Sequence, residues 1–411
     1  MSRFLFVVLP QAGHVNPPAA VAKVLAGHGH QVAWCGSPAR LRPSLETGAT
    51  IYPTGMRVFR GRPDTGMSAV KSLWQDFVVP FTRLTLPAVE KAVLDYQPDV
   101  VVTDQHALAG SLVAQRLGVP WATLCTSSME LAHPFRQLPK VDGWIREQLR
   151  AVTREAGLSP DAADDPRFSP YLVIVFASAA LLSCQPFPGQ PFPGQFALVG
   201  PALSARPDTP AFPWDRLDPA RRQVLVTVGT MAGEAAAMRF YRRAVQALCP
   251  LGDRLQAIVN APPDPVLPGS VLPDPVPPGL GLPRLPEHII ALDRIPMLSL
   301  MPRLDAVVCH GGMNTVCEAL SHGLPIVVAP LARDQPINAA AVVSAGAGLR
   351  VHFQRASPEQ LRACVLEVLD DPAYRIAAGR IRESFAAAGG AAEAAARLES
   401  LAERAIPLPV H

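Results

Sequence analysis

The sequence predicts an α/β protein made of two doubly wound domains, each built around a parallel sheet. Three observations predict this fold class. Short apolar runs of strand length alternate with segments of helical periodicity along most of the chain. The 411 residues exceed the roughly 250–300 at which a single hydrophobic core stops growing. Residues 206–222 are rich in proline and charge without apolar periodicity, which is typical of a linker between two domains.

The first domain, residues 1–205, opens with the apolar run 4–9. This run is too short for a signal sequence or a spanning helix, so we expect a cytoplasmic protein without stable membrane insertion. Asn16 and Pro17 then predict a helix start, with Asn16 as N-cap and Pro17 at the first helical position. The other expected strands are 31–35, 49–52, 98–104 and 121–124, and the expected helices are 18–27, 70–96 and 108–117.

The second domain, residues 223–385, repeats the alternation. Its expected strands are 224–228, 255–259, 288–292, 306–309, 325–330 and 348–351, and its expected helices are 235–248, 297–301, a helix beginning at Met313, and 358–369. The Pro-rich segments 185–195 and 261–286 are unlike helices or β-strands in composition, and we expect surface loops there.

Composition narrows the class of protein. Hydrophobic residues make up 49% of the chain and charged residues only 17%, which is typical of a well-buried globular enzyme. The formal net charge of +3 is too small to indicate a nucleic-acid partner. The cysteines form no CxxC pair, so neither a metal site nor a disulfide framework is expected.

The stretch 305–338 has the strongest functional signal. An apolar strand ends in His310, two glycines follow, and a helix begins with Asn314 and Thr315 near its start. Glycines let the backbone approach a ligand closely, and the unpaired N–H groups of a helix start favour an anion such as phosphate. Glu318 lies one turn further on, where its carboxylate could accept hydrogen bonds from sugar hydroxyls.

The pattern HGGMNT-x₂-E-A-L-x₃-G-x-P followed by Asp-Gln resembles the donor-binding signature of the UDP-glycosyltransferase superfamily, family 1 of the glycosyltransferases. The resemblance implies the GT-B fold, in which two Rossmann-like domains face each other across a cleft. It also implies that the last helix, within 386–411, returns to the first domain. The donor-binding residues that it implies are Thr230, Arg294, Ile295, His310, Gly312, Asn314, Thr315, Glu318, Asp334 and Gln335.

The same resemblance implies a catalytic pair in the first domain. His14 follows the first strand in a G-H-x-N-P turn, and Asp104 ends the strand 98–104. An imidazole titrates near neutral pH, and a carboxylate on its other nitrogen fixes the tautomer, so His14 suits a general base held by Asp104. The structural alternative is that His14 bonds a turn and Asp104 caps a helix.

The donor site departs from the family at one point. Many relatives have W-x-P-Q where this chain has Arg294-Ile295-Pro296-Met297, so the base-stacking aromatic is missing. Arg294 could stack on a pyrimidine and the backbone of Ile295 could pair with it. Both UDP- and dTDP-sugars therefore stay open as donors. No D-x-D motif lies near this site, so we expect neither a cofactor nor a metal requirement.

The predicted activity is inverting transfer of a hexose from the nucleotide sugar to a hydroxyl of an apolar polyketide, phenolic or terpenoid. Alternatives are a lipid or carotenoid acceptor, a catalytically silent nucleotide-sugar-binding protein, and a Rossmann oxidoreductase, although the first strand lacks G-x-G-x-x-G. Either a monomer or a homodimer is compatible with the sequence. The candidate acceptor-binding residues are the aromatics Phe59, Trp74, Phe77, Phe81 and Trp144, for which ordinary core packing is the alternative.

Overall fold

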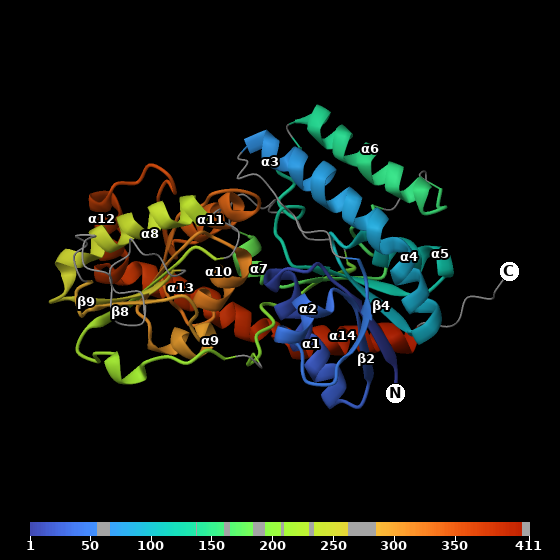
Figure 1. The fold of residues 1–411 in the computed structure, drawn as a ribbon, viewed down its shortest axis with the longest axis horizontal. Helices are drawn as coiled ribbons and strands as arrows, with labels where there is room; N and C mark the ends of the chain where they lie inside the picture. Colours follow the sequence, from blue (N-terminus) through green and yellow to red (C-terminus); the bar gives the residue numbers. More distant parts are fainter. Residues whose placement is uncertain are drawn as a thin grey trace, which may run out of the picture. The chain divides into compact units, whose positions relative to one another are not determined.

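The computed structural model describes residues 1–55, 66–136, 138–159, 165–183, 194–206, 209–229, 234–261 and 285–404. The described chain forms two compact units. The first contains the residues up to 183, residues 194–206 and those from 384 onward, and the second contains residues 209–383. Each unit is a parallel sheet with helices packed on it (Figure 1), so the predicted fold class is confirmed.

The first unit contains a seven-stranded sheet in the order β3-β2-β1-β4-β5-β6-β7, and every pair is parallel. Its strands are β1 Arg3–Val7, β2 Gln31–Gly36, β3 Thr50–Pro53, β4 Val100–Asp104, β5 Trp121–Cys125, β6 Leu172–Val175 and β7 Phe196–Leu198. Phe4, Leu5 and Phe6 of β1 are all fully buried. Successive side chains of a strand point to opposite faces, so both faces of this sheet are covered, which explains the unbroken apolar run.

Helices from both ends of the sequence cover the first sheet. The helices of this unit are α1 Ala12–Gly27, α2 Pro38–Leu41, α3 Gly66–Ser72, α4 Val79–Tyr96, α5 Leu108–Leu117, α6 Pro139–Glu155, α7 Ala179–Leu182 and α14 Gly390–Arg404, with a π-helical turn η2 Leu73–Val78 between α3 and α4. In Figure 1, α14 (red) lies beside α1 (blue). Ala394, Ala395 and Leu398 of α14 share a core with Phe4 and Phe6.

The predicted start of α1 is wrong. The helix begins at Ala12, four residues before Asn16, and its N-cap is Gln11 in an extended conformation. Asn16 lies inside the helix, where its side-chain oxygen accepts a hydrogen bond from Ser44 at 3.1 Å. Pro17 is also internal, but it lies in the second turn and removes only one early helical hydrogen bond. As a result His14 belongs to the first turn of α1.

The second unit contains a six-stranded parallel sheet in the order β10-β9-β8-β11-β12-β13. Its strands are β8 Arg222–Thr227, β9 Leu255–Asn260, β10 Ile289–Leu292, β11 Ala306–Cys309, β12 Ile326–Val328 and β13 Gly348–Arg350. Its helices are α8 Glu234–Leu248, α9 Met297–Leu300, α10 Met313–Leu320, α11 Gln335–Ser344, α12 Pro358–Asp370 and α13 Pro372–Ala388, the last of which runs on into residues of the first unit.

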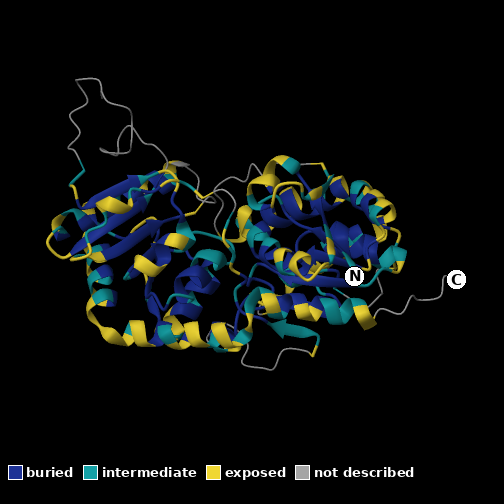
Figure 2. Cartoon of the chain, turned by 90° about the horizontal axis from the view of Figure 1, so that it is seen from below, coloured by how far each residue is buried: buried dark blue, intermediate teal, exposed yellow. Residues whose placement is uncertain are grey.

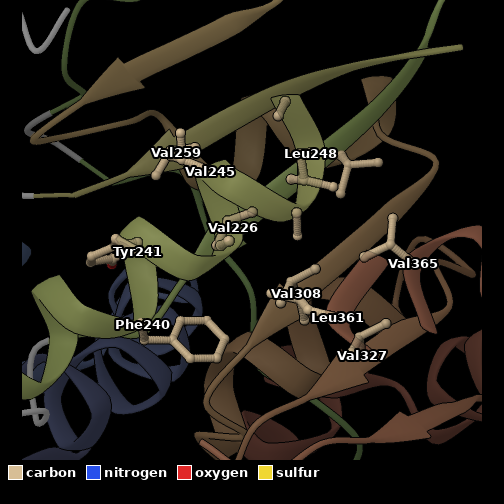
Figure 3. Packing of buried hydrophobic residues seen from close by; sticks show 14 of the residues in the cluster. Val226, Phe240, Tyr241, Val245, Leu248, Val259, Val308, Val327, Leu361 and Val365 are labelled. Atoms are coloured by element: carbon tan, nitrogen blue, oxygen red, sulfur yellow. The ribbon is translucent and has the colours of Figure 1, made fainter. Parts of the chain in front are cut away.

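The core of the second unit is formed by α8, α12 and the strands beneath them. Figure 3 shows Val245 and Leu248 of α8 with Val308 of β11 in this core. Phe240 stacks on Phe353 with ring centroids 4.8 Å apart. Figure 2 shows most strands of each unit as buried, and many of the exposed residues lie on helices.

Each sheet has one point at which the strand order reverses. In the first unit the chain builds β1, β2 and β3 outward and then returns to place β4 on the other side of β1. In the second unit β11 returns in the same way to the far side of β8. Ligands of open parallel sheets bind at the carboxyl ends of the strands beside such a reversal. The residues at or just after those ends include His14 and Asp104 in one unit, and Gly229 and His310 in the other.

None of the described helices combines the length and the apolar character that crossing a membrane requires.

Candidate active site

His14 and Asp104 meet at the strand-order reversal of the first sheet. His14 Nδ1 lies 2.8 Å from Asp104 Oδ2. The Asp104 side chain is fully buried, whereas the His14 side chain is 18% exposed. A buried carboxylate accepts the proton of Nδ1, so the ring is held in the tautomer that leaves Nε2 as the acceptor. This is the arrangement of a histidine positioned to take a proton.

Thr126 is a third member of this group that the sequence analysis did not identify. Its hydroxyl donates to Asp104 Oδ2 at 2.5 Å and accepts from His14 Nδ1 at 2.7 Å. Thr126 directly follows β5, at the same sheet edge as Asp104. The general rule that strand carboxyl ends hold ligand-contacting residues was the signal that could have identified it.

The charge state of Asp104 follows from its surroundings. Burial alone would raise the pKa of Asp104, but the His14 ring and its hydrogen bond, together with His106 and Thr126, hold that pKa below its ordinary value. Asp104 is therefore ionised at neutral pH. An ionised partner stabilises the imidazolium that forms when His14 takes a proton.

In the second unit the ring of His310 fills a space that two glycines leave open. A Cβ added at Gly229 or at Gly312 would come within 2.6 Å of the His310 ring. Gly229 also has a φ of +62°, a conformation that favours glycine. His310 is 7% exposed, and its Nδ1 has no hydrogen-bond partner among the described residues. A buried polar atom without a partner is typical of a site completed by a ligand.

The helix α10 begins next to His310. Its N-cap is Gly312, a residue without a side chain that could cap the helix. Asn314 and Thr315 lie in its first turn and are partly exposed, while Glu318 is 4% exposed in the next turn. The backbone N–H groups of a helix start and the positive end of the helix dipole attract an anion, so this end of α10 can bind a phosphate group.

The loop before α11 is tied to the same place. Asn338 donates its side-chain amide to the Gly311 carbonyl at 2.9 Å and to Asp334 Oδ2 at 3.2 Å. Gln335 Oε1 accepts from the backbone N–H groups of Leu331 and Ala332 at 2.8 and 3.1 Å. Asn338, which the sequence analysis did not identify, thus fixes Asp334 beside the glycine turn.

The remaining predicted donor residues are placed as follows. Arg294 is exposed and Ile295 is 8% exposed, and both follow β10 at the carboxyl edge of the sheet. The Ile295 carbonyl accepts from the Met297 N–H at 2.9 Å. Thr230 lies outside the described residues.

The aromatic acceptor candidates do not form one group. Phe77 and Phe81 are 1% and 3% exposed and stack on each other with centroids 5.7 Å apart, so they offer no surface to an acceptor. Trp74 is also buried, but it lines a cavity of about 450 Å³ in the first unit. Trp144 is partly exposed in α6, and Phe59 lies outside the described residues.

A pH titration can check the environment of His310. Burial lowers the pKa of His310 from 6.5 to about 4. The ring is therefore neutral in the folded protein at pH 7, and its contribution to stability is lost as the pH falls from 6.5 toward 4, where only the unfolded chain is protonated. We expect ¹⁵N spectra of histidine-labelled protein to show this ring titrating near pH 4. A midpoint at or above 6.5 would contradict its burial.

Together these features define a class of protein. A proton-accepting histidine at one sheet edge and an anion-binding helix start at another suit an enzyme that transfers a phosphate-activated group. No cluster of three or more potential metal-ligating side chains occurs in the described part of the chain.

Comparisons with known proteins agree with this class. A family model described as "Erythromycin biosynthesis protein CIII-like, C-terminal domain" matches residues 277–401. The 4'-demethylrebeccamycin synthase of Lentzea aerocolonigenes is 28% identical, over 97% of this chain and 99% of its own. The NDP-glycosyltransferase YjiC of Bacillus subtilis is 26% identical, over 97% of both chains. The crystal structure of the glycotransferase of kitacinnamycin superimposes with a TM-score of 0.75 at 25% identity, covering 97% and 99% of the two chains.

The chain is a glycosyltransferase with the GT-B fold. It is similar to glycosyltransferases of bacterial natural-product biosynthesis, which belong to family 1 of these enzymes.

Proposed function

We propose that the protein transfers a hexose from a UDP- or dTDP-sugar to a hydroxyl group of an apolar small molecule, with inversion at the anomeric carbon. The observation that supports this most strongly is the His14 ring, which Asp104 and Thr126 hold through Nδ1 so that Nε2 can accept a proton. Transfer to a hydroxyl requires such a base, and a single base suits a direct displacement without a covalent intermediate.

In the proposed reaction His14 Nε2 takes the proton of the acceptor hydroxyl. The oxygen then forms a bond to the anomeric carbon while the bond from that carbon to the diphosphate oxygen breaks. The negative charge of Asp104 stabilises the imidazolium formed at His14. One displacement at one carbon inverts its configuration.

The leaving diphosphate needs stabilisation in the second unit. The first N–H groups of α10 and the positive end of its dipole supply this. His310 contributes as a neutral hydrogen-bonding ring, because burial lowers its pKa to about 4. Glu318, which is buried one turn into α10, is assigned to the ribose hydroxyls. Asp334 and Gln335, on the separate loop before α11, are assigned to the transferred sugar.

The cavity of about 450 Å³ in the first unit is assigned to the body of the acceptor. Apolar side chains such as Met129, Phe135 and Ile145 contribute to its lining, and Glu130 and Arg167 add charged groups to it. Its volume is in the range of sites for drug-sized molecules, and its polar lining, which also includes Arg136, Asp142 and Arg146, can orient polar groups of the acceptor.

A product screen tests the proposed activity. The purified protein is incubated with UDP- and dTDP-glucose, each with a panel of phenols, polyketides and terpenoids, and the products are measured by mass spectrometry. We expect a mass increase of one hexose on at least one acceptor. If the protein binds the nucleotide sugars by calorimetry but neither transfers nor hydrolyses the sugar, it is a binding protein and the proposal fails.

Metal removal gives a separate prediction. Because α10 and His310 are assigned the role of a cation at the diphosphate, transfer should continue at an unchanged rate after exhaustive treatment with EDTA. The measurement compares initial rates before and after chelation and after adding back magnesium or manganese. Loss of activity with EDTA and its recovery with either ion would contradict this assignment.

A further inference from the structure

A second buried histidine–carboxylate pair lies beside His14 and Asp104. His106 follows β4, two residues after Asp104, and Glu130 lies in the segment that follows β5. His106 Nε2 is 2.8 Å from Glu130 Oε1, and the two side chains are 5% and 3% exposed. Burying two charged groups carries a large desolvation cost, so such a pair calls for a functional explanation. The proton transfer described above does not use it.

This second pair is connected to Asp104 through the backbone. The N–H of His106 donates to Asp104 Oδ1 at 2.9 Å. Gln105 Nε2 donates to Glu130 Oε2 at 2.5 Å. Glu130 therefore holds both residues that follow Asp104. The backbone N–H of His106 thereby occupies Oδ1 of the Asp104 carboxylate, and Oδ2 is left for His14 and Thr126.

The pair also places a positive charge near His14. Burial alone would lower the pKa of His106, but Glu130 and its hydrogen bond, together with Asp104, raise that pKa above its ordinary value. These neighbours favour the imidazolium form of His106, whose ring centroid lies 6.2 Å from that of His14. The pKa of Glu130 would be raised by burial, but His106 and Arg167 hold it below its ordinary value.

The other groups around His106 complete this arrangement. Trp74 of η2 presents an uncharged ring with its centroid 6.3 Å away. Burial, with Glu130 and Asp104, raises the pKa of the Cys125 thiol well above its ordinary value, so the thiol stays neutral. Arg167 donates hydrogen bonds to both carboxylate oxygens of Asp165. From Asp104 through His106, Glu130 and Arg167 to Asp165, the charges alternate in sign.

We propose that the His106–Glu130 pair is a positioning device for the His14–Asp104 pair: it fixes the Asp104 carboxylate and balances the charge beside His14. The assignment of His14 as the base rests on the proposed function. If the His106 cation were absent, the carboxylates of Glu130 and Asp104 would both stabilise a proton on His14. A histidine that already holds a proton cannot accept one from an acceptor. A positive charge at His106 opposes this effect of the two carboxylates.

The test measures the titration of His14 without requiring an acceptor. Full-length protein labelled with ¹⁵N-histidine is titrated by NMR, and the His14 signals are assigned from the spectrum of His14→Gln. His106→Gln, which keeps an amide donor toward Glu130 but loses the charge, should raise the His14 midpoint by about one pH unit. His106→Gln combined with Glu130→Gln removes both charges and should return the midpoint to within a few tenths of the wild-type value.

Three controls keep the test decisive. Glu130→Gln alone removes an anion, so it should leave the His14 midpoint unchanged or lower it; a rise would contradict the proposal even if His106→Gln does not fold. His28→Gln, at the exposed end of α1, should change nothing. Once an acceptor is known, the acidic limb of the pH–rate profile of each variant should shift in the same direction as the His14 midpoint measured by NMR.

The proposal is overturned if His106→Gln leaves the His14 midpoint in place, or if Glu130→Gln raises it, because either result would show that the pair acts only on folding. Absence of sugar transfer by the wild-type protein would refute the proposed function. It would leave the measured coupling between the two histidines intact, so the two failures are distinguishable.

Discussion

Replacing His14 with alanine is expected to lower turnover by about 100-fold or more, which is the usual contribution of a general base. The reason is the geometry: His14 Nε2 is the proton acceptor, because Nδ1 is bound to Asp104 and Thr126. The anion-binding groups belong to the second unit, so binding of the nucleoside diphosphate should be unchanged. Initial rates and calorimetric titration of the same preparation measure both quantities.

The choice of acceptor and a control variant determine whether a loss of turnover in His14→Ala can be attributed to the missing base. The acceptor should be an ordinary alcohol, since an acidic phenol ionises without help. His28→Ala, which removes an exposed histidine at the other end of α1, should retain full activity. Asp104→Asn should act in the same direction as His14→Ala but less severely. Wild-type turnover by His14→Ala at neutral pH would show that His14 is not the base.

Replacing Glu318 with alanine has the second largest expected effect. Glu318 is assigned to the ribose, which substrate and product share, so the variant should bind the free diphosphate and the intact donor more weakly. The expected loss is about 1.5–3 kcal/mol for each, as for hydrogen bonds to a charged group. Glu318→Gln has nearly the same shape and separates this loss from the effect of a cavity at a buried position. Calorimetry with the diphosphate and a slowly reacting donor analogue measures both affinities.

Asp334→Asn is the matched contrast to Glu318→Ala. The Asp334 side chain is assigned to the transferred sugar. In Asp334→Asn the free diphosphate should therefore bind with nearly unchanged affinity, while the preference between glucose and galactose donors should change. Gln335 suits this test less well, because its Oε1 holds the backbone of Leu331 and Ala332. If Asp334→Asn weakens the free diphosphate as much as Glu318→Ala does, the sugar does not lie on this loop.

The fold was predictable because most strands are short, mainly apolar runs that are followed by glycine or polar residues. That pattern located β11 and α10 to within a few residues. The start of α1 was not predictable, because the cap preferences of Asn16 and Pro17 compete with an extended Gln11 that allows the helix to begin earlier. Local preferences are weak compared with the packing of a whole helix.

The candidate site was predictable only where residue types follow a recognisable order. His14, Asp104 and the residues from His310 to Glu318 stand in such patterns. Thr126 does not, because a threonine after a strand is common and only the pairing of β4 with β5 brings it beside Asp104. The His106–Glu130 contact likewise joins residues 24 positions apart and has no sequence signature.

The configuration of the product shows whether the sugar is transferred by a direct displacement. With UDP-glucose, whose anomeric carbon has the α configuration, we expect a β-glucoside, identified by the large coupling between H1 and H2 in the ¹H NMR spectrum of the purified product. An α-glucoside would contradict the direct displacement by a hydroxyl that His14 deprotonates.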